Sequence, residues 1–325
     1  MPFAEGSSLL VRNIEAFGPS LLNILLIGTE RGLARAVPDC QPLMDGYEGF
    51  SVTLPEPVAS QSALIEAALP EGANGGNTLI LLADADQLVL KALHAATGFL
   101  KARGFVVNTL YARTLFVEPV QARVNPIHYE VMFNEAGKVA ANLRRGHYLE
   151  FGTFDGRTFT LAWHSMAKRC PWMRFFGFDS FTGILGARND EVYVDGTYCS
   201  NRETFEHNWR VAGLDPGRCM SVPGDFRESL AEPGLRERLG IEAAAVVHID
   251  CDVYEAAKAA LDFVAPVLQQ GSVLLFDEFH ANHASNATGE RRALRELLAA
   301  HPELEVERWH DYAVEGRSFL VHRHR

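Results

Sequence analysis

Short apolar runs alternate with amphipathic segments over residues 126–325, and this alternation constrains the fold more than any other feature. Five runs that end in small or acidic residues are typical of buried strands: HYLEFG, FFGFD, CMSVPGD, VVHID and VLLFDE. Helical patterns precede or separate them, namely residues 128–144, TFTLAWHSMAKR, RETFEHNWRVAG, EAAKAALDFVAPVLQQG and GERRALRELLAAH, and SFLVHR is a further strand. We therefore expect an α/β fold with a doubly wound, mostly parallel sheet, whose ligands bind beyond the carboxyl ends of its strands.

Residues 1–125 predict an additional small α/β domain. ILLIG, NTLILLAD and GFVVNTLYA are typical of strands, and residues 85–104 form an amphipathic pattern between the last two. The Pro- and Gly-rich stretches LPEPVA and LPEGANGGN indicate surface loops. Because no catalytic spacing occurs here, we expect this domain to capture substrate, dock a partner or form a dimer, with residues 126–325 as the catalytic domain.

Composition narrows the class of protein. With 325 residues, 47% of them hydrophobic, the chain can bury two ordinary cores. Its 41 acidic and 30 basic residues give a net charge of −11, which argues against binding to nucleic acid or an anionic membrane. Five cysteines without a C-x-x-C pair, no apparent signal peptide and no apolar run long enough to span a bilayer indicate a cytoplasmic protein. We expect a homo-oligomer that acts on a small molecule or on a substrate bound to a carrier or peptide.

Two predicted strands end in paired acids. In VVHIDCDVYEAAKAAL, Asp250 and Asp252 are two residues apart, so in an extended chain both side chains point to the same side and repel each other. The next strand ends in Asp277 and Glu278. A cation, a proton or a hydroxyl-bearing substrate is needed to hold such acids together.

Three other strand ends carry residues suited to a nucleoside ligand. Glu150, Gly152 and Gly156 form E-x-G-x-x-x-G, a turn in which glycine lets a ligand approach the backbone, and which differs from dinucleotide and phosphate-loop spacings. Asp179 is placed to accept two ribose hydroxyls, or to cap a helix. In VPGDFRESL, a carboxylate and an aromatic ring adjoin, which suits an exocyclic amine and a stacked base.

The ordered succession YLEFGTFDGRT, FFGFDSFTGI, GTYCSNRETFEHNW, VPGDFRESL, VHIDCDVYEAAKAALDFVAP and GSVLLFDEF resembles class I S-adenosylmethionine-dependent methyltransferases. It is most similar to the macrocin O-methyltransferase type, which methylates sugar hydroxyls of natural products. The resemblance covers residues 126–325 and implies S-adenosylmethionine as cofactor. It places the following residues around that cofactor: Glu150, Gly152, Thr153, Gly156, Asp179, Ser180, Asp225, Phe226 and Asp250.

The same resemblance implies a Mg²⁺ site and a general base. Asp250, Asp277 and Glu278 correspond to the metal ligands and Asp252 to the base, so Asp250 and Asp252 are the expected catalytic residues. The family has two aspartates where this chain has Asp277 and Glu278. Glutamate is longer than aspartate and Mg²⁺ requires near-octahedral geometry, so the sequence does not decide whether this site binds Mg²⁺. His280 and His283 follow closely, so a histidine base or a softer metal also stays open.

The sequence does not identify the molecule that accepts the methyl group. The leading hypothesis is O-methylation of a hydroxyl on a sugar or another natural-product intermediate. The alternatives are methylation of nitrogen or carbon on a peptide or carrier-bound intermediate, or a non-catalytic protein that binds the cofactor for assembly. Five aromatic residues near the expected site either stack on the acceptor or simply pack: Tyr193, Tyr198, Trp209, Tyr254 and Phe279.

Overall fold

A computed structural model of the chain describes residues 3–44, 46–84, 86–110 and 128–324. It divides into two compact units, one of residues 1–116 with 199–213 and one of residues 117–198 with 214–325. The boundary expected at residues 125 and 126 lies outside the described residues. The segment 199–213, which we expected within the catalytic domain, groups with the first unit.

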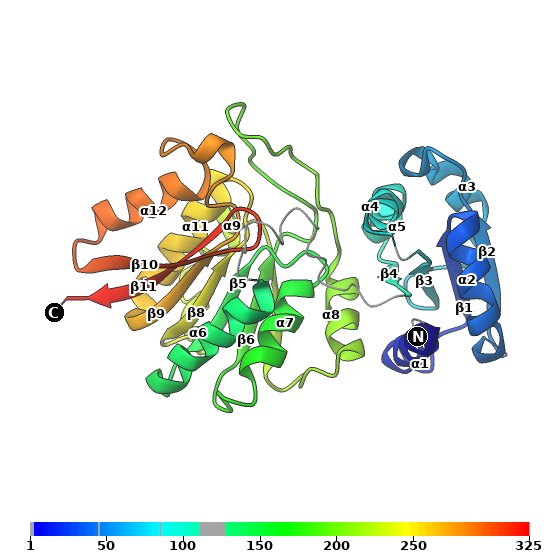
Figure 1. Cartoon of the computed structure of the whole chain (residues 1–325), viewed down its shortest axis with the longest axis horizontal. Coiled ribbons are helices and arrows are strands. Elements are labelled where there is room, and N and C mark those ends of the chain that lie inside the picture. Colours follow the sequence, from blue (N-terminus) through cyan, green and yellow to red (C-terminus); the bar gives the residue numbers. More distant parts are fainter. Residues whose placement is uncertain (1–2, 45, 85, 111–127, 325) are drawn as a thin grey trace. The chain divides into compact units, whose positions relative to one another are not determined.

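The first unit contains a four-stranded parallel sheet in the order β2-β1-β3-β4 (Figure 1). Its strands are β1 (Asn23–Gly28), β2 (Glu48–Thr53), β3 (Thr78–Leu82) and β4 (Val106–Thr109). Its helices are α1 (Phe3–Phe17), α2 (Glu30–Cys40), α3 (Ser62–Ala67), α4 (Gln87–Ala96), α5 (Gly98–Ala102) and α8 (Arg202–Val211). The inner strands are fully buried because both of their faces pack against apolar side chains.

Buried hydrogen bonds attach α8 to the first unit. The side-chain amide of Asn201 donates to the carbonyl oxygens of Lys101 and Phe105, at 2.6 and 3.0 Å, and its oxygen caps α8 by accepting from the Thr204 N–H. The ring of His207 lies 2.8 Å from the Asn13 side-chain oxygen, and burial lowers the pKa of His207 to about 3. Residues far along the sequence thus complete the N-terminal unit.

The second unit is built on a seven-stranded sheet in the order β10-β11-β9-β8-β5-β6-β7 (Figure 1). Its strands are β5 (His147–Phe151), β6 (Phe175–Asp179), β7 (Cys219–Pro223), β8 (Ala244–Ile249), β9 (Leu268–Phe276), β10 (Leu304–Tyr312) and β11 (Gly316–Arg323). The five strands from β9 to β7 are parallel, whereas β11 is antiparallel to β9 and to β10. All carboxyl ends of the parallel strands therefore meet at one edge.

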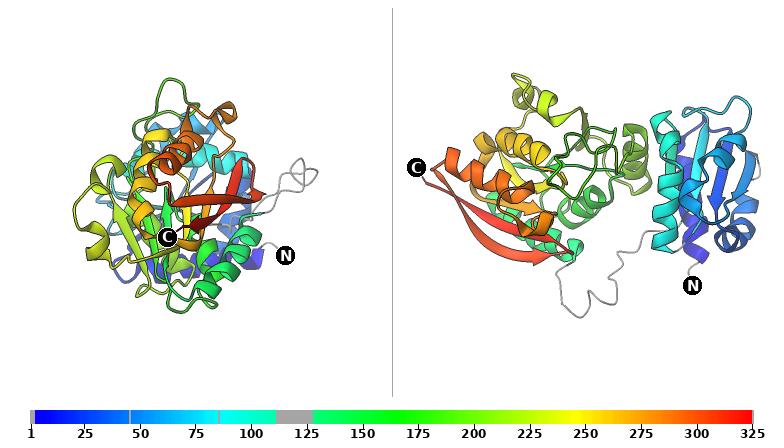
Figure 2. Two further views of the ribbon diagram at one scale, coloured as in Figure 1. Left: turned by 90° about the vertical axis from the view of Figure 1, so that its left-hand side faces the viewer. Right: turned by 90° about the horizontal axis from the view of Figure 1, so that it is seen from above.

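Helices cover both faces of this sheet, as Figures 1 and 2 show. They are α6 (Tyr129–Leu143), α7 (Arg157–Met166), α9 (Phe226–Ser229), α10 (Leu235–Leu239), α11 (Tyr254–Val264) and α12 (Gly289–Ala300). α6 packs on α7, and α11 packs on α9 and α12. The strands read as continuous apolar runs because both faces are covered, and β8 is buried at all six positions.

The predicted doubly wound α/β fold with an additional N-terminal α/β region is confirmed. Two strands, β2 and β10, were not predicted. The helix expected over residues 255–271 was predicted too long, because it ends at Val264 and residues 268–276 form β9. Among the described residues, no helix is both long and apolar enough to cross a membrane.

Candidate active site

The turn between β5 and α7 brings backbone to the carboxyl edge of the sheet. Gly152 has φ +87°, and a Cβ added there would lie 1.8 Å from the carbonyl oxygen of Asp250, so no side chain fits. Gly156, with φ +86°, immediately precedes α7. The side chain of Glu150 is fully buried and accepts hydrogen bonds from the hydroxyls of Tyr148 and Thr158.

Asp179, at the end of β6, ties this turn to the neighbouring strand. One carboxylate oxygen accepts from the N–H groups of Thr153 and Phe154, at 2.7 and 2.8 Å, and the other accepts from Phe181 N–H at 2.7 Å. Burial raises the pKa of Asp179, and these backbone hydrogen bonds oppose that rise. The adjacent Ser180 hydroxyl donates to the Gly183 carbonyl oxygen at 2.8 Å.

The third candidate pair, Asp225 and Phe226, follows β7. Asp225 caps α9 and forms an ion pair with Arg227. Phe226 is buried, and its ring lies edge-on to that of Phe151 with centroids 5.8 Å apart. In this structure Asp225 is therefore a partly exposed cap, and Phe226 belongs to the core beneath the strand ends.

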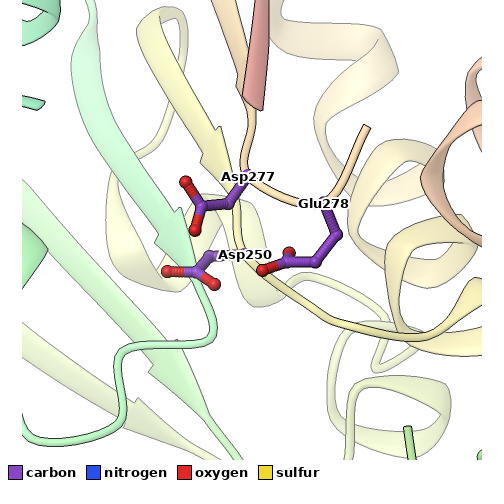
Figure 3. Close-up of side chains that lie close together, drawn as sticks. All are labelled: Asp250, Asp277 and Glu278. Atoms are coloured by element: carbon purple, nitrogen blue, oxygen red, sulfur yellow. The ribbon is translucent and has the colours of Figure 1, made fainter. Parts of the chain in front are cut away.

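The predicted acids of β8 and β9 lie together. Ile249 pairs with Phe276 in the sheet, so the residues that follow, Asp250 and Asp277, leave the sheet side by side. One oxygen each of Asp250, Asp277 and Glu278 lies within 4.8 Å of the other two (Figure 3). Burial and the neighbouring carboxylates raise the pKa values of Asp250 and Glu278 well above their usual range.

Asp252 lies next to this cluster in a left-handed backbone conformation, with φ +61°. Such a conformation is uncommon for a residue other than glycine and is often found at functional sites. Burial, with the charges of Asp277 and Asp179, raises the pKa of Asp252 to about 7. At neutral pH this carboxyl group can therefore both accept and release a proton.

Three residues near the acids were not predicted. The Tyr129 hydroxyl lies 2.6 Å from both oxygens of Asp277. His248 is fully buried, with one ring nitrogen 3.7 Å from Glu150 and the other 3.9 Å from Asp277. Glu290, in the first turn of α12, accepts from the Glu278 N–H at 3.1 Å.

Only one of these three residues had a usable signal in the sequence. His248 lies two residues before Asp250 on a strand, so the period of two places their side chains on one side. Tyr129 is 148 residues before Asp277, and Glu290 is 12 residues after Glu278 in α12; nothing in the local sequence of either residue marks it.

Other candidates do not join the acids. Within the described residues, the one group whose ligand atoms could hold a metal is Asp250, Asp277 and Glu278, which includes neither His280 nor His283. His280 lies 3.9 Å from Asp311, and the His283 residue is exposed.

Of the five aromatic candidates, two lie near the acids. The charges of Glu278 and Asp252 add to burial in raising the pKa values of Tyr193 and Tyr198, and the two rings are 6.5 Å apart. Trp209 packs on Phe205 in α8, and the other two are mainly packing residues, since the Tyr254 hydroxyl donates to Glu296 and Phe279 is buried.

Comparisons with known proteins concern the fold of this unit. Residues 149–279 match a family model described as a methyltransferase domain, and this segment contains every predicted cofactor, metal and base residue. Among solved structures, the chain is similar to the calicheamicin methyltransferase CalS11, with a TM-score of 0.51 and 22% identity over 63% of this chain and 81% of that chain. The O-methyltransferase NovP gives a TM-score of 0.49 and 20% identity over 60% and 79% of the two chains. No curated protein matches. The similarity to CalS11 supports the fold.

Proposed function

We propose that this chain is a methyltransferase that uses S-adenosylmethionine, and that it transfers the methyl group to a hydroxyl of a small molecule, a sugar or another natural-product intermediate; the match of residues 149–279 to a methyltransferase domain supports the first part. The observation that carries the proposal is the position of Asp252. It lies at the same sheet edge as the glycine turn after β5 and the loop after β6, where a class I cofactor binds. A proton acceptor beside the cofactor is what an alcohol acceptor requires.

The cofactor residues remain those named from the sequence. Gly152 and Thr153 would present backbone to the methionine part, with Gly156 at the start of α7. Asp179 is already bonded to three backbone N–H groups, so in this role it would orient the turn as well as accept from ribose. Ser180, Asp225 and the ring of Phe226 would border the nucleoside.

Methyl transfer from a sulfonium ion to oxygen is an in-line displacement, in which the C–S bond breaks as the C–O bond forms. Alignment of the two reactants supplies roughly 7–11 kcal/mol of the barrier reduction. A sugar hydroxyl is a weak acid, so its proton must leave as attack proceeds. The carboxylate form of Asp252 would accept that proton, and a pKa of about 7 allows this near neutral pH.

The donor set of the acidic cluster fits a divalent cation. Three carboxylates lie within 4.8 Å of one another, and one oxygen of Glu278 is buried without a hydrogen-bond partner in the described part of the chain. Asp250, Asp277 and Glu278 would hold Mg²⁺, a cation that prefers oxygen ligands. When bound, it would offset the repulsion between the acids and lower the pKa of an acceptor hydroxyl.

Calorimetric titration of the full chain with S-adenosylhomocysteine, with Mg²⁺ or with EDTA, tests the proposal. We expect cofactor binding in both buffers and a separate binding heat for Mg²⁺. Absence of cofactor binding would refute the methyltransferase assignment, whereas cofactor binding without Mg²⁺ binding would refute only the proposed role of the cation.

Transfer of an isotope-labelled methyl group to glycosides, with the product linkage assigned by NMR, tests which atom of the acceptor is methylated. Methylation at nitrogen or carbon would contradict the O-methylation proposal.

A further inference from the structure

Basic side chains gather beside the acidic cluster, although the chain as a whole carries a net charge of −11. We call them the basic cluster: Arg291, Arg308, Arg317 and His280. Arg308 and Arg317 both donate to Asp311, at 2.5 and 2.6 Å, and a ring nitrogen of His280 lies 3.9 Å from the same carboxylate. These contacts bring three members of the cluster, Arg308, Arg317 and His280, together around the Asp311 carboxylate.

A buried ring connects the remaining member. The guanidinium carbons of Arg291 and Arg317 lie 4.9 and 5.3 Å from the ring centroid of Phe279. The Arg291 side chain donates to the neutral Asn286 side chain at 3.0 Å, and no carboxylate in the described residues lies within 4.0 Å of it. Of these three guanidinium groups, those of Arg308 and Arg317 share one carboxylate, that of Asp311, and that of Arg291 pairs with none in the described residues, which leaves a local excess of positive charge.

The excess charge is reflected in the pKa of Arg291. Burial, with the positive charge of Arg317, lowers the pKa of Arg291 from its usual value. An anion close to both guanidinium groups would relieve this repulsion. Guanidinium groups also match a phosphate geometrically, because two parallel N–H donors can meet two of its oxygens.

The sheet register places the basic cluster at the edge where the acids lie. Arg317 pairs with Phe276, the last residue of β9, which directly precedes Asp277. Asp311 pairs in turn with Arg317 on the next strand. Phe279 and His280 follow Glu278 along the chain. Asp252 follows β8, so a molecule whose hydroxyl reaches Asp252 has Arg317 two strands away and Arg308 three strands away in the same sheet.

We propose that the basic cluster binds a phosphate group of the acceptor, so that the acceptor is a phosphorylated or diphosphate-linked small molecule. This inference rests on the proposed function, since it assigns the acceptor class of the same site. The carboxylates of the acidic cluster repel the phosphate group but not an uncharged hydroxyl of the same molecule, while the basic cluster attracts the phosphate. The two clusters together would fix which hydroxyl faces the cofactor.

Titration calorimetry tests this with the full chain saturated with S-adenosylhomocysteine, in EDTA and at low ionic strength, with inorganic pyrophosphate as the probe. We expect binding that weakens as salt increases, because an ion pair is screened. Arg291→Gln and Arg308→Gln should each raise the pyrophosphate Kd at least several-fold. Arg308 is a safe second variant, because its side chain is 61% exposed.

Arg238→Gln is the matched control, since Arg238 is also exposed, pairs with one carboxylate and lies on α10. It should leave the Kd unchanged. Equal pyrophosphate affinity in the wild type and both basic-cluster variants would overturn the inference, and so would acetate binding as tightly as pyrophosphate. Retained affinity for S-adenosylhomocysteine in Arg291→Gln separates failure of this inference from failure of the proposed function.

Discussion

The hydrogen bond from Tyr129 to Asp277 leads to a quantitative prediction. Tyr129→Phe removes one oxygen atom and keeps the ring, which packs on Phe133 and Tyr312. The lost hydroxyl lies 2.6 Å from both carboxylate oxygens. Asp277 is then left at a site where its side chain is only 14% exposed, so water replaces the hydroxyl incompletely.

The expected cost follows from this environment. Hydrogen bonds to charged groups contribute about 1.5–3 kcal/mol, and the cost rises when the remaining partner stays buried. We expect Tyr129→Phe to lower the free energy of unfolding at neutral pH by about 1.5–3 kcal/mol. For a unit of this size, that corresponds to a fall of roughly 3–12 °C in melting temperature.

Urea denaturation followed by near-ultraviolet circular dichroism measures this change in EDTA. Tyr254→Phe is a matched control, because the Tyr254 hydroxyl also lies 2.6 Å from a carboxylate, that of Glu296, whose side chain is 38% exposed. Its loss should cost no more than about 1 kcal/mol. If Tyr129→Phe is no more destabilising than Tyr254→Phe, the hydroxyl does not hold Asp277 as argued.

Three further predictions concern the base, the cofactor loop and the N-terminal unit. Asp252→Asn should preserve the affinity for S-adenosylhomocysteine and abolish turnover, and full activity of this variant would exclude Asp252 as the base. The turnover of the wild type should rise with pH through about 7, as Asp252 loses its proton. Asp179→Ala should weaken cofactor binding in calorimetry, because three backbone N–H groups lose their acceptor, whereas Asp215→Ala, which removes an exposed turn bond, should not. Asn201→Ala should cost about 2–4 kcal/mol in urea denaturation, since a helix cap and two buried bonds are lost, whereas exposed Asn74→Ala should cost under about 1 kcal/mol.

The apolar runs predicted every strand that is buried on both faces, and also the partly buried strands β7 and β11. The two missed strands lie at sheet edges, and their residues are mostly exposed or half-buried, so neither forms an apolar run. The helix boundary near Val264 was missed because Leu268–Gly271 combines polar residues with a glycine that has φ +85°. Pairing with β8 and β11, rather than local preference, makes that segment a strand.

The position of α8 was also beyond local sequence. Its amphipathic pattern predicts a helix, and a helix is present, but the pattern does not say which sheet it covers. That choice is made by specific buried hydrogen bonds: the Asn201 amide donates to the carbonyl oxygens of Lys101 and Phe105, and the Thr204 hydroxyl oxygen accepts from the Val107 N–H. Partners about 100 positions apart cannot be paired from composition or period.

The acids at the strand ends could be predicted because the carboxyl ends of parallel strands meet at one edge. The open question was whether Glu278 could stand where two aspartates are usual, given its extra methylene. Glu290 bears on this point, since it binds the Glu278 N–H and so fixes where the longer side chain begins. From that anchored start, a Glu278 oxygen lies within 4.8 Å of the Asp250 and Asp277 oxygens. The longer side chain is thus compatible with a three-carboxylate site, because Glu290, 12 residues later in α12, fixes the backbone of Glu278.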